Sequence, residues 1–179
     1  FLDSPKHRLL IADEVGLGKT IEAGLILTEM RARQLMKRVL VVCPANLLDK
    51  WRWELKRRFG EDFKIMDAKS FEQFLRDYEE EPQNTMLSGI ISLESIRQET
   101  ILKRIEALSP SFDLVIVDEA HHMRNFGRKQ RKAGVLLARG KQAMLFLTAT
   151  PIHLGSENLF SLLNILDEEE FPDFNTVNG

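Results

Sequence analysis

The sequence predicts a three-layer α/β fold, in which helices cover both faces of a mostly parallel central sheet. Four short runs are almost entirely apolar, which is typical of strands buried on both faces. These runs are residues 9–12, 39–43, 114–117 and 144–147. Longer amphipathic stretches lie between them, and this alternation favours right-handed strand–helix–strand crossovers. A length of 179 residues fits one domain with a substantial core.

The first strand is expected at residues 9–12 and the first helix at residues 19–35. Apolar side chains recur in that helix at Ile21, Leu25 and Ile26, and Glu and Arg residues gather toward its end. Such a pattern is typical of a helix that packs one face against a sheet.

The second strand, residues 39–43, precedes an amphipathic helix at residues 46–59. The apolar positions of this helix recur at spacings of three and four: Leu48, Trp51, Leu55 and Phe59. Asn46 is followed three residues later by Asp49, which predicts a capping-box-like start.

The remaining strands are expected at residues 85–92, 114–117 and 144–147, with a short one at Ile65 and Met66. Residues 79–84 are acidic and contain a proline, so they predict a surface loop. The acidic residues 167–170 predict a second solvated segment.

Composition excludes several classes of protein. A hydrophobic fraction of 44% with 29% charged residues argues against disorder, and a net charge of −2 means that any nucleic-acid surface must be local. The single cysteine, Cys43, cannot form an internal disulfide and suits a reducing compartment. No apolar run reaches the ~20 residues needed to cross a bilayer, and no signal-peptide pattern is visible. We therefore expect a soluble cytoplasmic protein that does not bind a membrane.

A phosphate-binding loop is predicted where the first strand meets the first helix, at residues 16–20 (GLGKT). Glycines let the backbone N–H groups approach an anion, and the helix N-terminus adds about half a positive charge. Lys19 would reach the β- and γ-phosphates, and the Thr20 hydroxyl would bind Mg²⁺. The pattern G-x-x-x-x-G-K-[ST] is incomplete, because Asp13 stands at its first glycine. The alternative is a glycine-rich turn with an exposed lysine.

A pair of carboxylates follows the strand at residues 114–117, in the tetrapeptide DEAH (residues 118–121). Open α/β sheets bind their ligands at the carboxyl ends of their strands. Asp118 is the candidate to hold Mg²⁺ through water, and Glu119 the candidate to orient or activate the attacking water. His121 could link the γ-phosphate to a neighbouring strand. The alternative is an acidic start to the next helix.

The two adjacent histidines, His121 and His122, do not by themselves predict a zinc site. No further Cys or His lies at ligand spacing in the sequence, so zinc is not expected. A third short segment, TAT (residues 148–150), ends the last apolar run and predicts a polar hinge near the other two segments.

At these segments the sequence resembles the first RecA-like lobe of superfamily-two helicases, specifically the Swi/Snf-like DNA translocases. The resemblance covers almost the whole chain and is carried by ADEVGLGKTIEAGLI (residues 12–26), VVCPANLLDKWRWEL (41–55), IISLESI (90–96), VIVDEAHHMRN (115–125) and LTATPIHLGSENLFSLLNIL (147–166). These segments are similar to motifs I, Ia, Ib, II and III of the family. Its motif I has Asp where Asp13 stands, which accounts for the missing glycine. Residues 14–16 and 21–24 resemble the bacterial and archaeal RapA-like (HepA-like) branch.

The resemblance implies a RecA-like P-loop NTPase fold and ATP-driven translocation on double-stranded DNA, with ATP and Mg²⁺ as cofactors. The implied nucleotide-binding residues are Asp13, Glu14, Gly16, Leu17, Gly18, Lys19, Thr20 and His121. Thr20 and Asp118 would hold Mg²⁺, and the implied catalytic residues are Lys19, Asp118 and Glu119. Thr148 and Thr150 would couple the state of the nucleotide to the grip on DNA. The implied contacts to the DNA backbone are Pro44, Ala45, Asn46 and Ser92.

The family divides its active site between two lobes, and no segment of this chain matches the second lobe. The arginines that such a lobe supplies are worth about 10³–10⁵ in rate in related enzymes. We therefore expect residues 1–179 to form one helicase ATP-binding lobe, with the second lobe absent from this chain and hydrolysis by the isolated lobe barely detectable. The expected partners are double-stranded DNA, bound weakly by this lobe alone, the second lobe, and a protein complex such as RNA polymerase.

The residues themselves give weaker support for DNA binding. One basic cluster lies on the polar side of the helix at residues 46–59: Lys50, Arg52, Lys56, Arg57 and Arg58. A second follows the carboxylates: Arg124, Arg128, Lys129, Arg131 and Lys132. Basic groups near phosphates would give salt-dependent binding, but a solvated charged face explains each cluster equally well. Trp53 lies off the apolar stripe and could contact a partner, but packing against another element is expected for it.

Three other functions share parts of this pattern. A DEAH-type RNA helicase lobe would have the same tetrapeptide, although residues 12–26 and 41–55 argue against it. A catalytically silent binding module would retain the fold, but the intact residues Lys19, Asp118 and Glu119 argue against that. A small nucleotide kinase would need neither the DEAH nor the TAT segment.

Overall fold

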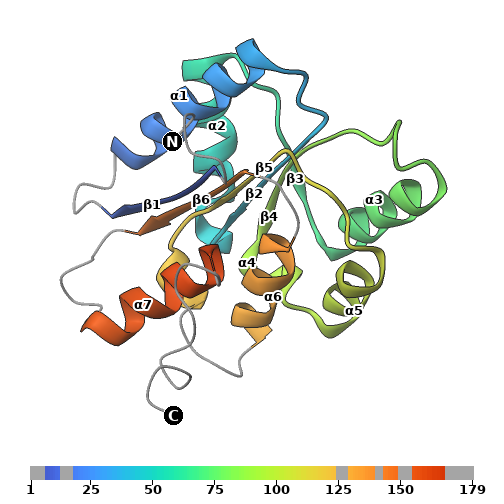
Figure 1. Cartoon of the computed structure of the whole chain (residues 1–179). Coiled ribbons are helices and arrows are strands. Elements are labelled where there is room, and N and C mark those ends of the chain that lie inside the picture. Colours follow the sequence, from blue (N-terminus) through green and yellow to red (C-terminus); the bar gives the residue numbers. More distant parts are fainter. Residues whose placement is uncertain (1–6, 13–17, 124–128, 140–142, 149–154, 168–179) are drawn as a thin grey trace.

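The computed structural model describes residues 7–12, 18–123, 129–139, 143–148 and 155–167. They form a six-stranded sheet in the order β1-β6-β5-β2-β4-β3, in which every pairing is parallel (Figure 1). The strands are β1 (Arg8–Ala12), β2 (Arg38–Cys43), β3 (Lys64–Met66), β4 (Leu87–Ser92), β5 (Leu114–Val117) and β6 (Ala143–Thr148). The predicted three-layer α/β fold with a parallel sheet is confirmed.

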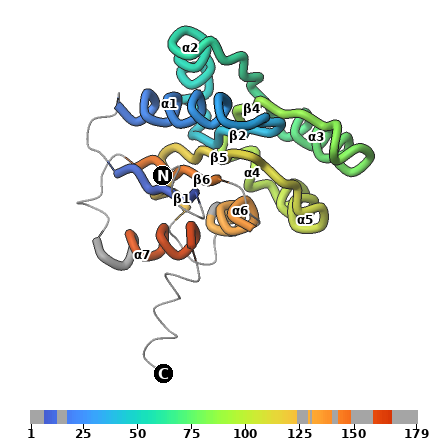
Figure 2. Tube along the Cα trace, turned by 45° about the horizontal axis from the view of Figure 1, so that its top comes forward, coloured from blue at the N-terminus to red at the C-terminus, as the bar shows by residue number. Residues whose placement is uncertain are grey.

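Helices cover both faces of this sheet (Figure 2). One face carries α1 (Gly18–Arg33) and α2 (Leu48–Phe59), which pack against the sheet through one apolar cluster. The other carries α3 (Ala68–Glu80), α4 (Leu93–Ile96), α5 (Glu99–Leu108), α6 (Lys129–Ala138) and α7 (Gly155–Leu166). The short 3₁₀ turns η1 (Ala45–Leu47) and η2 (Ala120–Met123) come after β2 and β5.

The central strands are almost entirely apolar between their ends because each is buried on both faces. In β2, Leu40 and Val42 belong to one core cluster, whereas Val39 and Val41 belong to the other. Successive side chains of a strand point to opposite faces, so only a continuous apolar run can satisfy two helical layers at once. The four apolar runs of the sequence correspond to β1, β2, β5 and β6.

Helices α1 and α2 approach each other closely at Gly24. A Cβ atom at this position would overlap the ring of Phe59, which ends α2. Gly60 then ends the helix in the left-handed conformation, and its N–H donates to the carbonyl of Lys56 at 3.0 Å.

Three sequence predictions differ from the structure in detail. The capping box predicted at Asn46 and Asp49 is wrong: the N-cap of α2 is Leu47, which makes no side-chain cap hydrogen bond. The η1 turn precedes the helix instead, and its bond from the Leu48 N–H to the carbonyl of Ala45 satisfies an N–H group that the cap would take. Helix α3 continues to Glu80, so the predicted loop is confined to residues 81–84. The strand expected at residues 85–92 begins at Leu87.

A polar network closes the amino-terminal edge of the sheet, the edge opposite the predicted site. The Arg38 guanidinium donates to the carbonyls of Pro82, Thr85 and Ser111. The Asp113 carboxylate accepts from the backbone N–H groups of Lys37 and Arg38, at 2.8 Å each. These charges are structural. Among the helices of the described ranges, none has the length and apolar character that a membrane span requires.

Candidate active site

The segments singled out in the sequence meet at one edge of the sheet. Strands β1, β6, β5 and β2 are consecutive neighbours, and because all pairings are parallel their carboxyl ends lie at the same edge. Ala12 is paired with Thr148, and Val117 with both Phe146 and Val42. Ligands of open α/β sheets bind at this edge.

Helix α1 begins at this edge, and its first residues, Gly18, Lys19 and Thr20, belong to the predicted phosphate loop. Lys19 and Thr20 lie in its first turn and are buried, with Lys19 only 3% exposed. The alternative of an exposed lysine on a glycine-rich turn is therefore wrong. Five of the predicted site residues lie outside the described residues: Asp13, Glu14, Gly16, Leu17 and Thr150.

The carboxylate of Asp118 is held from two sides. Its Oδ2 atom accepts a hydrogen bond from Trp51 Nε1 at 2.9 Å, and its Oδ1 atom accepts one from the backbone N–H of Glu119 at 2.8 Å. The backbone N–H of Asp118 donates to the carbonyl of Val42 at 2.8 Å and so extends the pairing of β5 with β2. The acid is thus anchored by a strand, a turn and a helix.

Sequence reasoning missed the role of Trp51, because it assigned this residue only to the apolar face of α2. A buried indole N–H almost always finds an acceptor. That rule indicates a polar partner for Trp51, although it does not say which.

Glu119 is the next residue and adopts the left-handed conformation, with φ of 53°. Burial, followed by the charge of Asp118, raises the pKa of its carboxyl above the ordinary value. The positive charges of Lys19, His122 and Lys50 act in the opposite direction. The charge of Lys19 lowers the pKa of Glu119, so the first turn of α1 lies within electrostatic range of this carboxyl.

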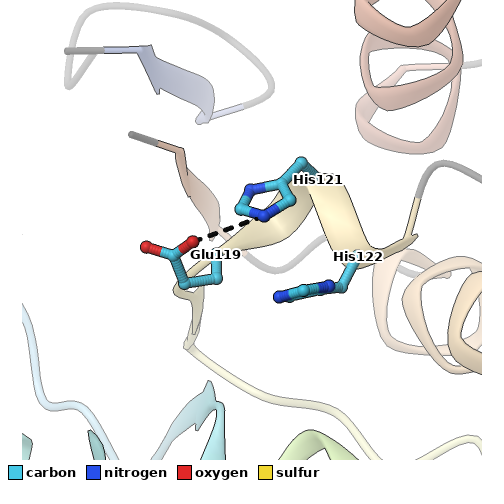
Figure 3. Close-up of side chains that lie close together, drawn as sticks. All are labelled: Glu119, His121 and His122. Atoms are coloured by element: carbon cyan, nitrogen blue, oxygen red, sulfur yellow. Dashed lines mark ion pairs between the residues drawn. The ribbon is translucent and has the colours of Figure 1, made fainter. Parts of the chain in front are cut away.

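His121 joins Glu119 to the neighbouring strand. Its Nδ1 atom lies 3.2 Å from Thr148 Oγ1, and its Nε2 atom lies 3.4 Å from Glu119 Oε2. Figure 3 shows the His121 ring turned toward the Glu119 carboxylate, with the His122 ring beside it at 4.4 Å between ring centroids. Thr148 is fully buried at the end of β6. His121 thus contacts a neighbouring strand, whereas its predicted link to the γ-phosphate stays a prediction.

Glu119, His121 and His122 also bring three potential metal-ligand atoms within 4.8 Å of one another. The sequence argument against zinc counted only Cys and His and did not include the carboxylate. Glu119 and His121 are already part of the site described above, so the cluster belongs to that site.

The predicted DNA contacts lie at the same edge, in two neighbouring segments. Pro44, Ala45 and Asn46 lie in and before η1, and Ala45 and Asn46 are exposed. Ser92 is paired with Cys43 across β2 and β4, but its side chain is buried and caps α4 by accepting from Ser95 N at 3.0 Å. These positions therefore lie close together, but the Ser92 hydroxyl is buried and accepts a hydrogen bond within the fold.

The two basic clusters differ in nature. The cationic residues of α2 are all exposed: Lys50, Arg52, Lys56, Arg57 and Arg58. Trp53, beside them, is 55% exposed and stacks under the Arg57 guanidinium at 5.3 Å, so the packing against another element expected for it is not found in the described part of the chain.

In the second cluster, one of the described cations does not lie on the surface. Arg131 is 8% exposed and donates to Ser161 Oγ at 2.7 Å and Asn164 Oδ1 at 2.8 Å, tying α6 to α7. Lys132 pairs with Glu106 at 3.1 Å, and Lys129 with Glu99 at 3.9 Å. Arg124 and Arg128 lie outside the described residues. Of this cluster, Arg131 serves the core.

Comparison with known proteins agrees with this geometry. A family model described as the SNF2-related domain matches residues 2–178. RNA polymerase-associated protein RapA of Haemophilus influenzae (strain PittEE) is 40% identical over 175 residues, covering 94% of this chain and 18% of its own length. RapA of Yersinia pestis (strain Pestoides F) is 40% identical over 171 residues, covering 93% and 17%. The chain thus spans less than a fifth of the length of these relatives.

Solved structures share the fold. The Sulfolobus solfataricus SWI2/SNF2 ATPase core in complex with dsDNA matches with a TM-score of 0.67 at 23% identity, over 90% of this chain and 31% of that one. The Pyrococcus furiosus Hef helicase domain matches with a TM-score of 0.60 at 21% identity, over 90% and 34%. The RecA-like α/β architecture of SNF2 ATPase cores is therefore the architecture of this chain.

Proposed function

This chain belongs to the SNF2-related domain family, and we propose that it is the first, ATP-binding lobe of an ATP-driven translocase on double-stranded DNA. The observation that carries the proposal is the meeting of three motifs at one sheet edge. The charge of Lys19 acts on Glu119, and His121 joins Glu119 to Thr148. A nucleotide kinase would need no such connection to β6.

The residues present fit a magnesium–nucleotide complex. The start of α1 offers N–H groups to phosphates, with Lys19 beside them, and Thr20 and Asp118 supply the hard oxygen donors that Mg²⁺ prefers. Bound Mg²⁺ would neutralise charge on the β- and γ-phosphates. In this proposal Lys19 binds phosphate and Thr20 and Asp118 hold the ion.

Glu119 then receives the proton of the attacking water. Its raised pKa brings the carboxyl closer to the pH at which it works, which favours a general base. His121 contacts both the Glu119 carboxylate and the Thr148 hydroxyl. We propose that loss of the γ-phosphate is transmitted through these contacts to β6 and the TAT segment. The TAT segment would then couple hydrolysis to DNA binding. The exposed η1 turn, with Ala45 and Asn46, is the proposed contact to the DNA backbone.

We further propose that the domain extends over residues 1–179 and works with a second RecA-like lobe that supplies arginines to the transferring phosphoryl group. The relatives named RNA polymerase-associated protein support a protein complex such as RNA polymerase as a partner, and a cytoplasmic location. The isolated lobe should bind nucleotide weakly and hydrolyse it barely.

The test measures ATP hydrolysis by the full-length protein that contains this chain, without nucleic acid, with duplex DNA and with duplex RNA. We expect stimulation by duplex DNA. Glu119→Gln should lower kcat by about 10²–10⁴ while ATP still binds, and Lys19→Ala should weaken MgATP binding itself. Stimulation by RNA alone would support the RNA helicase instead. Equal heats of MgATP binding for wild type and Lys19→Ala would point to a silent module.

A further inference from the structure

A single buried side chain joins helix α2 to the acid of the second motif. Trp51 is 1% exposed and packs in the core cluster that α1 and α2 form with the sheet. Its indole N–H nevertheless points out of that core and donates to Asp118 Oδ2 at 2.9 Å, across 67 positions of the chain. A tryptophan has only two side-chain torsions, and both are fixed here by packing, so the position of the donor is set by the core.

The two donors to Asp118 act on different oxygens. Trp51 occupies an acceptor site of Oδ2, and the backbone N–H of Glu119 occupies one of Oδ1. A carboxylate has about four acceptor sites, so this arrangement fixes the plane of the group and retains capacity for the waters around a cation. Partners that orient a metal-binding carboxylate in this way contribute to metal affinity although they never touch the ion.

We propose that Trp51 is the positioning residue of the magnesium site, an inference that rests on the proposed function above. Its indole holds the Asp118 carboxylate in the orientation that receives Mg²⁺. Trp51 lies about one helical turn after the start of α2, and α2 comes directly after the exposed η1 turn. If DNA contact at η1 moves α2, the Trp51 indole that donates to the Asp118 carboxylate moves with the helix.

The chain offers a matched control on the same helix. Trp51 and Trp53 are the two tryptophans of the sequence, and Trp53 is exposed and contacts Arg57 rather than Asp118. Trp51→Phe removes the N–H donor and retains an aromatic ring in the core. Trp53→Phe makes the same chemical change on the surface.

The experiment measures ADP binding by calorimetry in the full-length protein that contains this chain, with Mg²⁺ titrated from zero and with EDTA. Wild type, Trp51→Phe and Trp53→Phe are compared. We expect Trp51→Phe to raise the Mg²⁺ concentration needed for half-maximal tightening by about 10-fold or more, and Trp53→Phe to leave it unchanged. ADP affinity in EDTA should be the same for all three.

Two results would overturn the proposal. An unchanged Mg²⁺ requirement in folded Trp51→Phe would show that the hydrogen bond does not position the acid. Equal weakening with Mg²⁺ and with EDTA would show that Trp51 acts only through packing. If wild type binds no ADP, or binds it without regard to Mg²⁺, the proposed function fails as well, so the two failures are distinguishable.

A second measurement keeps the proposal testable if Trp51→Phe does not fold. The full-length protein is labelled with 5-fluorotryptophan after every other tryptophan, Trp53 included, has been replaced by phenylalanine, so that the remaining resonance belongs to Trp51. The fluorine resonance of Trp51 should shift further with ADP and Mg²⁺ than with ADP and EDTA. A Trp51 resonance that is indifferent to Mg²⁺ would refute the role.

Discussion

Replacing Arg131 by Met separates the structural from the nucleic-acid interpretation of the basic residues after the DEAH segment. Methionine keeps an apolar stem of similar length but removes the two short bonds to Ser161 Oγ and Asn164 Oδ1. A bond from a charged donor contributes about 1.5–3 kcal/mol, and both acceptors are buried, although the Ser161 hydroxyl can rotate toward another group. We therefore expect a local cost of about 3 kcal/mol for the contact between α6 and α7.

Amide hydrogen exchange in the full-length protein that contains this chain measures this loss of stability locally, in α6 and α7. About 3 kcal/mol corresponds to roughly 100-fold faster exchange of the amides of α6 and α7. Lys132→Met is the control, because Lys132 is exposed on the same helix and makes a surface pair with Glu106. It should change exchange by a small fraction of that amount.

The salt dependence of DNA binding provides the opposing result. A lysine or arginine that contacts a phosphate changes the slope of log K against log salt by about one when it is removed. We expect the slope of Arg131→Met to equal that of wild type. A slope reduced by about one, with exchange of α6 and α7 unchanged, would refute the structural assignment and restore Arg131 to a DNA surface.

The pKa shifts give two further predictions. The raised pKa of Glu119 means that the base is still protonated at a pH where an ordinary glutamate is ionised, so the acidic limb of the kcat/KM profile should lie above the usual glutamate range. Lys50→Ala removes a positive charge that opposes the shift and should move this limb to higher pH, whereas a limb at or below the ordinary value would contradict the assignment. Burial, with the charges of Asp118 and Glu94, raises the pKa of the Cys43 thiol to about 12, so iodoacetamide at pH 8 should label native Cys43 far more slowly than the urea-unfolded chain. Equal rates by mass spectrometry would show that β2 opens readily.

Much of the fold is predictable because its signals are local. Strands such as Leu114–Val117 are recognisable from four consecutive apolar side chains, since a strand between two helical layers turns side chains toward an apolar core on both faces. The sequence also predicts that the three motifs lie close together, because each motif follows a strand and parallel strands have their carboxyl ends at the same edge of the sheet. The start of α2 was predicted wrongly because the sequence pattern considered only a side-chain cap. A backbone turn at η1 replaces that cap.

The sequence by itself determined the class of the fold, the family and the residue types at the sheet edge. Only the tertiary structure decided which polar side chains meet. Arg131 and Lys132 are neighbours in a basic run, yet one is tied inside the core to α7 and the other lies on the surface. Trp51 belongs to an apolar stripe by its spacing, yet its N–H binds an acid 67 residues away. The physical reason is that periodicity specifies which face of an element is buried, whereas the partner of a buried donor depends on which other element is packed against that face.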